Sequence, residues 1–139
     1  MVDQNNIRGL VQDLSELLDR RMEVLREGTV LGSVRPSDAK VFMLASRHSR
    51  TTADIARDLG VSKQAVHMSV QRLKEKDVVR MVPAENSNRD KVIEITERGQ
   101  EIRGLVAKKI AIIEAEIEAK LGKGKTKEFR QSLLKLLEP

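Results

Sequence analysis

Apolar residues recur at steps of three and four along the first part of the chain, which is the spacing of one face of a helix. This pattern occupies Ile7–Leu25, and Gly28 and Gly32 follow it as residues suited to end a helix. The same spacing returns in Ile102–Leu121 and again in Phe129–Leu137. Both ends of the chain are therefore predicted to be long amphipathic helices.

Three shorter helices are predicted between these ends. The first begins at about Ser37, which we expect to be its N-cap. The second covers Thr52–Leu59, because Thr51 and Asp54 have the spacing of a capping box in which Asp replaces the usual Glu or Gln. The third has Ser62 as its expected N-cap and runs to about Lys76.

The pattern then changes to that of strands. Val78–Val82 and Val92–Ile95 are rich in β-branched residues, and the polar segment 83–90 between them contains many turn formers. These features predict a β-hairpin with a long exposed tip. Thr96 opens the next helix, in which Gly99 is read as a tolerable interior residue.

The middle of the chain has the features of a helix-turn-helix. Ala56 is small enough to lie where two helices cross, and Gly60, four residues later, tolerates the positive φ that the turn requires. The second helix of the motif needs one stripe to bury against the domain, and this stripe is Val66, Val70 and Leu73. With the hairpin that follows, these features predict a winged helix-turn-helix.

The opposite face of that second helix is polar. Lys63, Gln64 and His67 lie in its first half, where side chains of a recognition helix reach base edges in the major groove. Hydroxyl groups at helix N-termini can hold phosphate oxygens. The candidate DNA-binding residues of the motif are therefore Thr51, Thr52, Ser62, Lys63, Gln64, His67, Gln71 and Arg72. The alternative is an ordinary solvated helix face.

Residues 52–62 (TADIARDLGVS), 70–80 (VQRLKEKDVVR) and 93–99 (IEITERG) resemble the winged-helix core of the MarR family of bacterial regulators. The long terminal helices also match that family's layout. The resemblance implies that a wing arginine seven residues before the helix-opening threonine, here Arg89, enters the minor groove. A narrow minor groove concentrates negative potential, so an arginine suits that position. A solvated loop arginine is the alternative.

Three positions depart from the family's pattern. Asp77 replaces a frequent Gly, although Asp tolerates left-handed geometry better than most residues. Met68 replaces a frequent basic residue in the recognition helix, so base preference is expected to differ. Ser87 replaces an acidic residue two positions before the wing arginine, which weakens the expectation that Arg89 is oriented in advance.

The predicted fold class is mainly α with a small β-hairpin wing: a winged helix-turn-helix plus N- and C-terminal dimerisation helices. We place the N-terminal dimerisation helix at 1–34, the DNA-binding domain at 35–98 and the C-terminal dimerisation helices at 99–139. The terminal helices carry more apolar surface than one winged helix can cover, which favours a homodimer. Packing into a monomeric bundle is the alternative.

Composition narrows the functions. The chain has 139 residues and a net charge of +5, which favours a polyanionic partner. It has no cysteine, and its only aromatic residues are Phe42 and Phe129, which argues against thiol chemistry and against base-stacking platforms for single strands. No metal-ligand spacing surrounds His48 or His67, and no catalytic motif stands out, so neither a metal, a cofactor nor an enzyme is predicted. The absence of a signal peptide or apolar span predicts a cytoplasmic protein with no membrane partner.

These observations predict a sequence-specific regulator that binds double-stranded DNA as a dimer. Two recognition helices about 34 Å apart would select a pseudo-palindromic operator. The resemblance implies a repressor relieved by a small-molecule effector that binds between the dimerisation helices and the winged helix. Arg47 and His48 could reach such a cleft, although an ordinary surface role is favoured. A nucleoid-type architectural DNA binder and a winged-helix protein–protein adaptor remain open alternatives.

Overall fold

A computed structural model describes residues 5–47, 50–86 and 89–139 of the chain. It divides into two compact units, one formed by Ser33–Leu105 and the other by the N-terminal residues up to Gly32 together with Val106–Pro139. The long helix α5 (Glu97–Leu121) begins in the first of these units and continues into the second. Within the described residues, no helix combines the length and the apolarity needed to cross a membrane.

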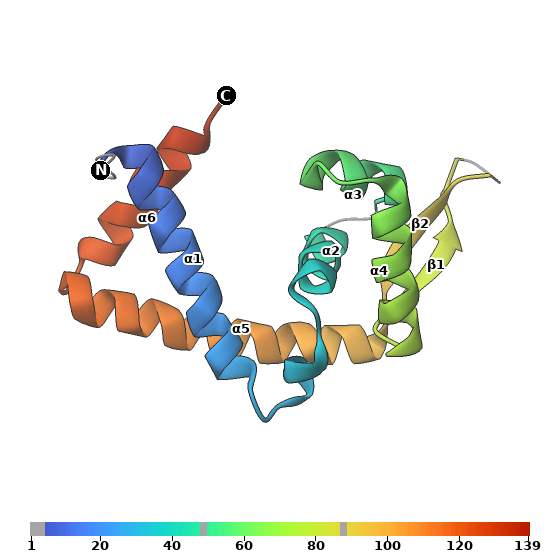
Figure 1. Ribbon diagram of the computed structural model, residues 1–139, viewed down its shortest axis with the longest axis horizontal. Helices are drawn as coiled ribbons and strands as arrows, with labels where there is room; N and C mark the ends of the chain where they lie inside the picture. Colours follow the sequence, from blue (N-terminus) through green and yellow to red (C-terminus); the bar gives the residue numbers. More distant parts are fainter. Residues whose placement is uncertain (1–4, 48–49, 87–88) are drawn as a thin grey trace. The chain divides into compact units, whose positions relative to one another are not determined.

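The unit built from the two ends of the chain is helical (Figure 1). It contains α1 (Ile7–Arg26), the C-terminal part of α5, and α6 (Lys125–Leu137). The Asn6 side chain caps α1 by accepting a hydrogen bond from the Gly9 N–H at 2.8 Å. After α1, Gly28 adopts a φ of 72°, which the sequence predicts for a helix end. A short 3-10 turn at Val30–Ser33, which the sequence does not predict, follows it.

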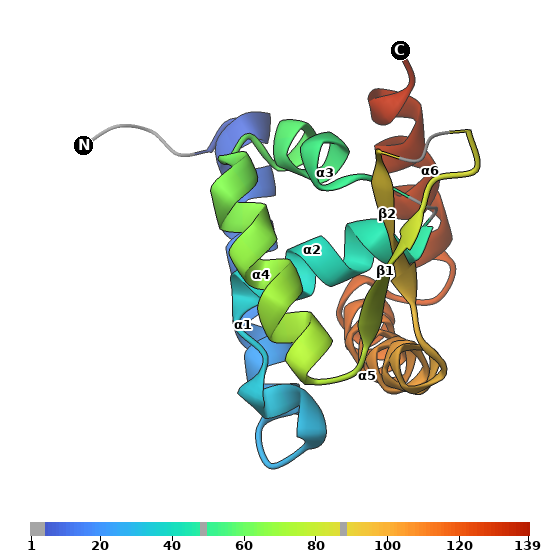
Figure 2. The ribbon, with the colours of Figure 1, turned by 90° about the vertical axis from the view of Figure 1, so that its right-hand side faces the viewer.

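The unit Ser33–Leu105 is a winged helix-turn-helix. Its helices are α2 (Pro36–Arg47), α3 (Thr52–Leu59) and α4 (Lys63–Glu75), followed by strands β1 (Val79–Pro83) and β2 (Lys91–Ile95) and by the start of α5. The strands pair antiparallel, with Val79 opposite Ile95 and Met81 opposite Ile93. Figure 2 shows α2 passing behind α4 toward the hairpin, and α2 contacts both of these elements. The predicted fold class, mainly α with a small β-hairpin wing, is therefore confirmed.

The core of this unit joins α2, α3, α4 and the hairpin. Ile55 of α3 is completely buried, and Leu73 of α4 and Ile93 of β2 are nearly so. The remaining buried members of the cluster are Val41, Phe42, Ala45, Ala56, Val66, Val70, Val78 and Val79. Burying an aliphatic side chain of this size stabilises a fold by roughly 1.5–3 kcal/mol, so this cluster fixes the three helices on the hairpin.

The end of α4, the start of β1 and the start of α5 are joined by short polar contacts. The Thr96 hydroxyl donates to the Asp77 carbonyl at 2.6 Å and accepts from the Gly99 N–H at 3.0 Å. Arg98 Nε donates to the Lys76 carbonyl at 3.2 Å. Asp77 has a φ of 60°, so the left-handed geometry expected of this residue is confirmed.

Gly99 is more than a tolerated helix residue, and this corrects the expectation from sequence. A Cβ at this position would lie well inside van der Waals distance of the Val78 carbonyl oxygen and 2.5 Å from Ile95 Cγ2. Glycine is therefore required because α5 passes directly against Val78, which precedes β1, and Ile95 of β2.

The start of α2 also differs from the prediction. The helix begins at Pro36, so Ser37 lies in the first turn and is not the N-cap. The Ala39 N–H donates to the Arg35 carbonyl at 3.0 Å, which places the cap two residues earlier. Proline suits the first helical position because its missing N–H would have had no partner inside the helix.

Candidate nucleic-acid interface

Local capping interactions begin α3 and connect it to α4. Thr51 Oγ1 accepts from the Asp54 N–H at 3.1 Å, and Asp54 Oδ2 accepts from the Thr51 N–H at 3.2 Å, which completes the predicted capping box. Gly60 ends α3 with a φ of 67°, and Ser62 Oγ caps α4 by accepting from the Ala65 N–H at 3.0 Å. With Ala56 buried in the core between them, the two helices have the predicted helix-turn-helix arrangement.

The two faces of α4 differ as the sequence predicts. Its inner face buries Val66, Val70 and Leu73. The outer face exposes Lys63, Gln64 and His67, and Gln71 is half-buried at its edge. The exposed groups supply cationic and neutral donors and an amide acceptor, which are the groups that read base edges.

Three hydroxyl groups lie at the N-termini of the motif's helices. Thr51 and Ser62 use their oxygen lone pairs as helix caps, and Thr52, half-buried like Thr51, is the first residue of α3. A capping hydroxyl still has its hydrogen to donate, so these groups retain the capacity to bind a phosphate oxygen.

Arg72 is directed toward α2. Its Nε donates to Asp38 Oδ2 and its Nη2 donates to Asp38 Oδ1, both at 2.9 Å, and Nη2 also lies 3.4 Å from Ser69 Oγ. The Asp38 side chain is only 1% exposed. Sequence reasoning grouped Arg72 with the residues that contact DNA, but its guanidinium is already committed to an intramolecular ion pair.

The wing is the β1–β2 hairpin and its tip. The Ala84 N–H donates to the Asp90 carbonyl at 2.9 Å, which continues the pairing beyond the strands. Arg80 and Glu94 form an ion pair across the hairpin. Arg89 is exposed in the tip, whereas Ser87, the family departure beside it, lies outside the described residues.

A groove of about 390 Å³ lies along the seam between α2 and α4. Its lining includes Lys40 of α2 and Met68 of α4, and Arg72 borders it. The two helices are therefore not packed tightly along this edge. Arg47, at the end of α2, is exposed, and His48 lies outside the described residues.

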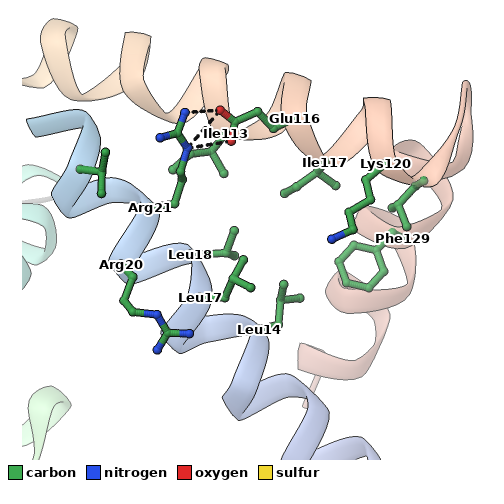
Figure 3. Close-up of a pocket in the computed structure, with 12 residues that line it drawn as sticks. Leu14, Leu17, Leu18, Arg20, Arg21, Ile113, Glu116, Ile117, Lys120 and Phe129 are labelled. Atoms are coloured by element: carbon green, nitrogen blue, oxygen red, sulfur yellow. Dashed lines mark hydrogen bonds and ion pairs between the residues drawn. The ribbon is translucent and has the colours of Figure 1, made fainter.

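The unit formed by the chain ends has a large apolar surface. A groove of about 670 Å³ lies between α1 and α5, with Phe129 of α6 beside it (Figure 3). Arg21 spans it to Glu116, with Nε 2.9 Å from Oε2. Exposed apolar residues continue along the helices, among them Ile7, Leu10, Val11, Leu134, Leu136 and Leu137. Such a surface is typical of a face that a partner covers.

Two structural residues were missed by sequence reasoning, Asp38 and Gly99. Asp38 was read only as a favourable charge in the first turn of α2, since its partner lies 34 positions away. Gly99 was missed because its close neighbours belong to the hairpin. No group of His or acidic residues suited to a metal ion occurs in the described part of the chain.

Residues 41–90 match the family model described as MarR family. No curated protein sequence matches the chain. Among solved structures, wild-type MarR of E. coli in its apo form is similar with a TM-score of 0.80 and 18% identity, over 96% of this chain and 98% of that one. A MarR transcriptional regulator from Methanosarcina mazei Go1 has a TM-score of 0.77 and 14% identity, over 94% and 92% of the two chains.

A third similar structure is that of CouR from Rhodococcus jostii RHA1, bound to p-coumaroyl-CoA. Its TM-score is 0.74 and its identity 17%, over 97% of this chain and 94% of that one. At these identities the three structures establish a shared fold.

Proposed function

The chain belongs to the MarR family through its winged helix-turn-helix, residues 41–90, and from this premise we propose that it is a dimeric transcription regulator that binds double-stranded DNA in a sequence-specific manner. The observation that carries the proposal is the division of α4 into a buried apolar face and an exposed polar face. A helix anchored on one side and polar on the other is suited to enter a major groove.

Within this proposal, Lys63, Gln64 and His67 read base edges. Lysine suits the acceptors of guanine, and glutamine can pair with both adenine groups in the major groove. Gln71 makes a smaller contribution because it is half-buried. We leave Arg72 out of this set, since Asp38 holds its guanidinium.

Phosphate contacts come from Thr51, Thr52 and Ser62, which lie at the N-termini of α3 and α4. Arg89 in the wing tip inserts into the adjacent minor groove, where a narrow groove favours a guanidinium. Contacts of these two kinds orient the protein on the duplex and leave α4 to choose the sequence.

The apolar surface of the terminal helices supports a homodimer as the functional form. In a single chain Ile7 remains 73% exposed, Leu136 72% and Leu137 79%. A monomeric bundle would leave these residues in water, whereas a second copy covers them. A two-fold dimer separates its recognition helices by about one DNA turn, roughly 34 Å, and selects a pseudo-palindromic site.

We further propose a repressor relieved by a small-molecule effector. The CouR structure, which holds p-coumaroyl-CoA, provides a precedent for a ligand on this fold. In a dimer of this kind, the two winged helices can lie at more than one distance from each other. An effector of any chemistry can act only by binding one of these arrangements more tightly than another.

The test is selection of bound fragments from a genomic library, followed by binding measurements over a range of salt concentrations. A two-fold-symmetric enriched site is the expected result. A flat sequence profile with a steep salt dependence would instead indicate an architectural DNA binder. If the protein binds no DNA even at low salt, the winged-helix protein–protein adaptor is the hypothesis that remains.

Variants assign the roles of individual residues. Gln64→Ala and His67→Ala should each alter base preference within the half-site, and an unaltered preference in both would remove them as readers. Arg89→Ala should weaken binding without unfolding the protein. Arg103→Ala is its matched control, because it removes an exposed arginine of α5 outside the motif and the wing.

A further inference from the structure

The polar side chains buried among the described residues are Asp38 and Ser69. Asp38 is the third residue of α2, and Ser69 lies on the side of α4 that faces it. Arg72, one turn farther along α4, brings its guanidinium to Asp38 in a two-bond fork. A charged pair at a helix seam of this kind needs an explanation, because apolar residues would fill the same space with no desolvation cost.

Apolar packing fixes the buried stripe of α4 but does not reach the edge of the helix that faces Lys40. Val66, Val70 and Leu73 hold the helix on the core, but hydrophobic contact is not directional. On the side toward Lys40 and Met68 the seam is open, since the groove of about 390 Å³ lies there. A planar fork of two parallel hydrogen bonds supplies the directional restraint that this edge otherwise lacks.

Ionisation of the pair is secure at neutral pH. Burial opposes the charged form of Asp38, but hydrogen bonds from Arg72 and Ser69 and the nearby charges of Arg72 and Arg35 outweigh it and hold the pKa of the carboxyl group below its ordinary value. The hydrogen bond to Asp38 likewise raises the pKa of the Arg72 guanidinium. The fork is therefore present throughout the physiological range.

We propose that Asp38 is a positioning residue, which acts through Arg72 to fix the rotation of α4 about its own axis and thereby determines the base preference of the protein. The inference rests on the proposed DNA-binding function. It assigns to Arg72 the orientation of the helix and leaves base contacts to Lys63, Gln64 and His67.

The geometry indicates why a small rotation matters. Side-chain tips lie about 5–6 Å from the axis of a helix, so a rotation of about 20° moves them by about 2 Å. A hydrogen bond to a base edge tolerates a donor–acceptor distance of about 2.7–3.2 Å. Loss of the fork is therefore expected to weaken discrimination between sequences, and replacing both partners leaves the net charge unchanged.

The deciding variant replaces both partners, Asp38→Leu with Arg72→Met, which keeps the net charge and leaves no buried charge unpaired. We measure its affinity for a duplex enriched from a random library by the wild-type protein and for a shuffled duplex of the same composition. The ratio of the two affinities should fall by about tenfold, with little change for the shuffled duplex. A ratio equal to that of the wild type overturns the proposal.

Two further variants support this comparison. Arg72→Lys keeps the charge but loses the fork, so it should lose discrimination in the same direction, and it decides the question if the double variant does not fold. Glu114→Gln with Arg130→Gln removes an exposed ion pair at equal net charge and should leave the ratio unchanged.

A measurement without DNA separates this inference from the proposed function. Residual dipolar couplings of the α2 and α4 amides, recorded on the full chain, should differ between the wild type and the double variant. Unchanged couplings overturn the positioning role. If the wild-type protein enriches no sequence, sequence-specific binding fails, and the couplings alone then decide whether Asp38 orients α4.

Discussion

Two glycines of α5, Gly99 and Gly104, allow the close approach of this helix to the hairpin to be tested by a matched pair of substitutions. Both lie within α5, and both are changed to alanine. At Gly99 the new Cβ would meet the Val78 carbonyl oxygen and Ile95 Cγ2, whereas at Gly104 nothing lies within 4 Å. The same chemical change is therefore expected to have opposite effects at the two positions.

The magnitudes follow from two competing terms. Alanine is favoured over glycine inside a helix by about 1 kcal/mol, so Gly104→Ala should stabilise the protein by about 0.5–1 kcal/mol. Overpacking costs typically 1–3 kcal/mol, and the cost at Gly99 lies at the upper end because a backbone oxygen cannot rotate away. Net destabilisation by Gly99→Ala is thus about 1–2 kcal/mol, or a factor of roughly 5–30 in the unfolding equilibrium.

Urea unfolding at a fixed protein concentration measures both effects. The chain has neither tryptophan nor tyrosine, so far-ultraviolet circular dichroism is the suitable probe. Fixed concentration matters because association would raise the apparent stability. If Gly99→Ala proves as stable as the wild type while Gly104→Ala gains stability, the expected clash of the new Cβ with Val78 and Ile95 is refuted.

Three further predictions concern the helix-turn-helix and its support. Thr51→Ala removes the capping box with Asp54 and should lower the free energy of unfolding by about 1–2 kcal/mol, measured by urea unfolding. Ile55→Ala empties a fully buried site and should cost about 2–5 kcal/mol by the same measurement. Because the folded-state pKa of Asp38 is lowered, its ionised form stabilises the fold above the ordinary carboxyl pKa, and this stabilisation is lost as the pH falls through the folded-state value. Asp38→Asn should therefore be less stable than the wild type at pH 7, with the difference shrinking below about pH 4 in thermal unfolding.

Each of these has a clear contrary result. Equal unfolding midpoints for Thr51→Ala and the wild type would mean that the capping box is not formed in solution. A loss below about 1 kcal/mol for Ile55→Ala would place that side chain outside the core. A stability difference for Asp38→Asn that is the same at pH 3 and pH 7 would contradict the lowered pKa of Asp38.

Elements whose signals are local were predicted well from sequence. Thr51 with Asp54, Gly60 and Ser62 each act on backbone groups within four residues, so the residues that make the contact are also neighbours in the chain. Asp77 belongs to the same class, because left-handed geometry depends on the residue itself. The inner and outer faces of α4 likewise follow from its period.

Features that depend on distant contacts were not predictable. The Asp38–Arg72 pair joins residues 34 positions apart, and the side chains of α4 give no sign of which polar group turns inward. The role of Gly99 depends on where Val78 and Ile95 lie after folding. The N-cap at Ser37 was a wrong choice between two local signals, since Pro36 at the first helical position prevailed.

The contacts of Thr96, Arg98 and Gly99 with the segment that ends α4 have a mechanical consequence. They tie the first turn of α5 to the residues that follow α4, through hydrogen bonds and direct backbone contact. A displacement of the first turn of α5 is therefore expected to move the C-terminal end of α4 with it.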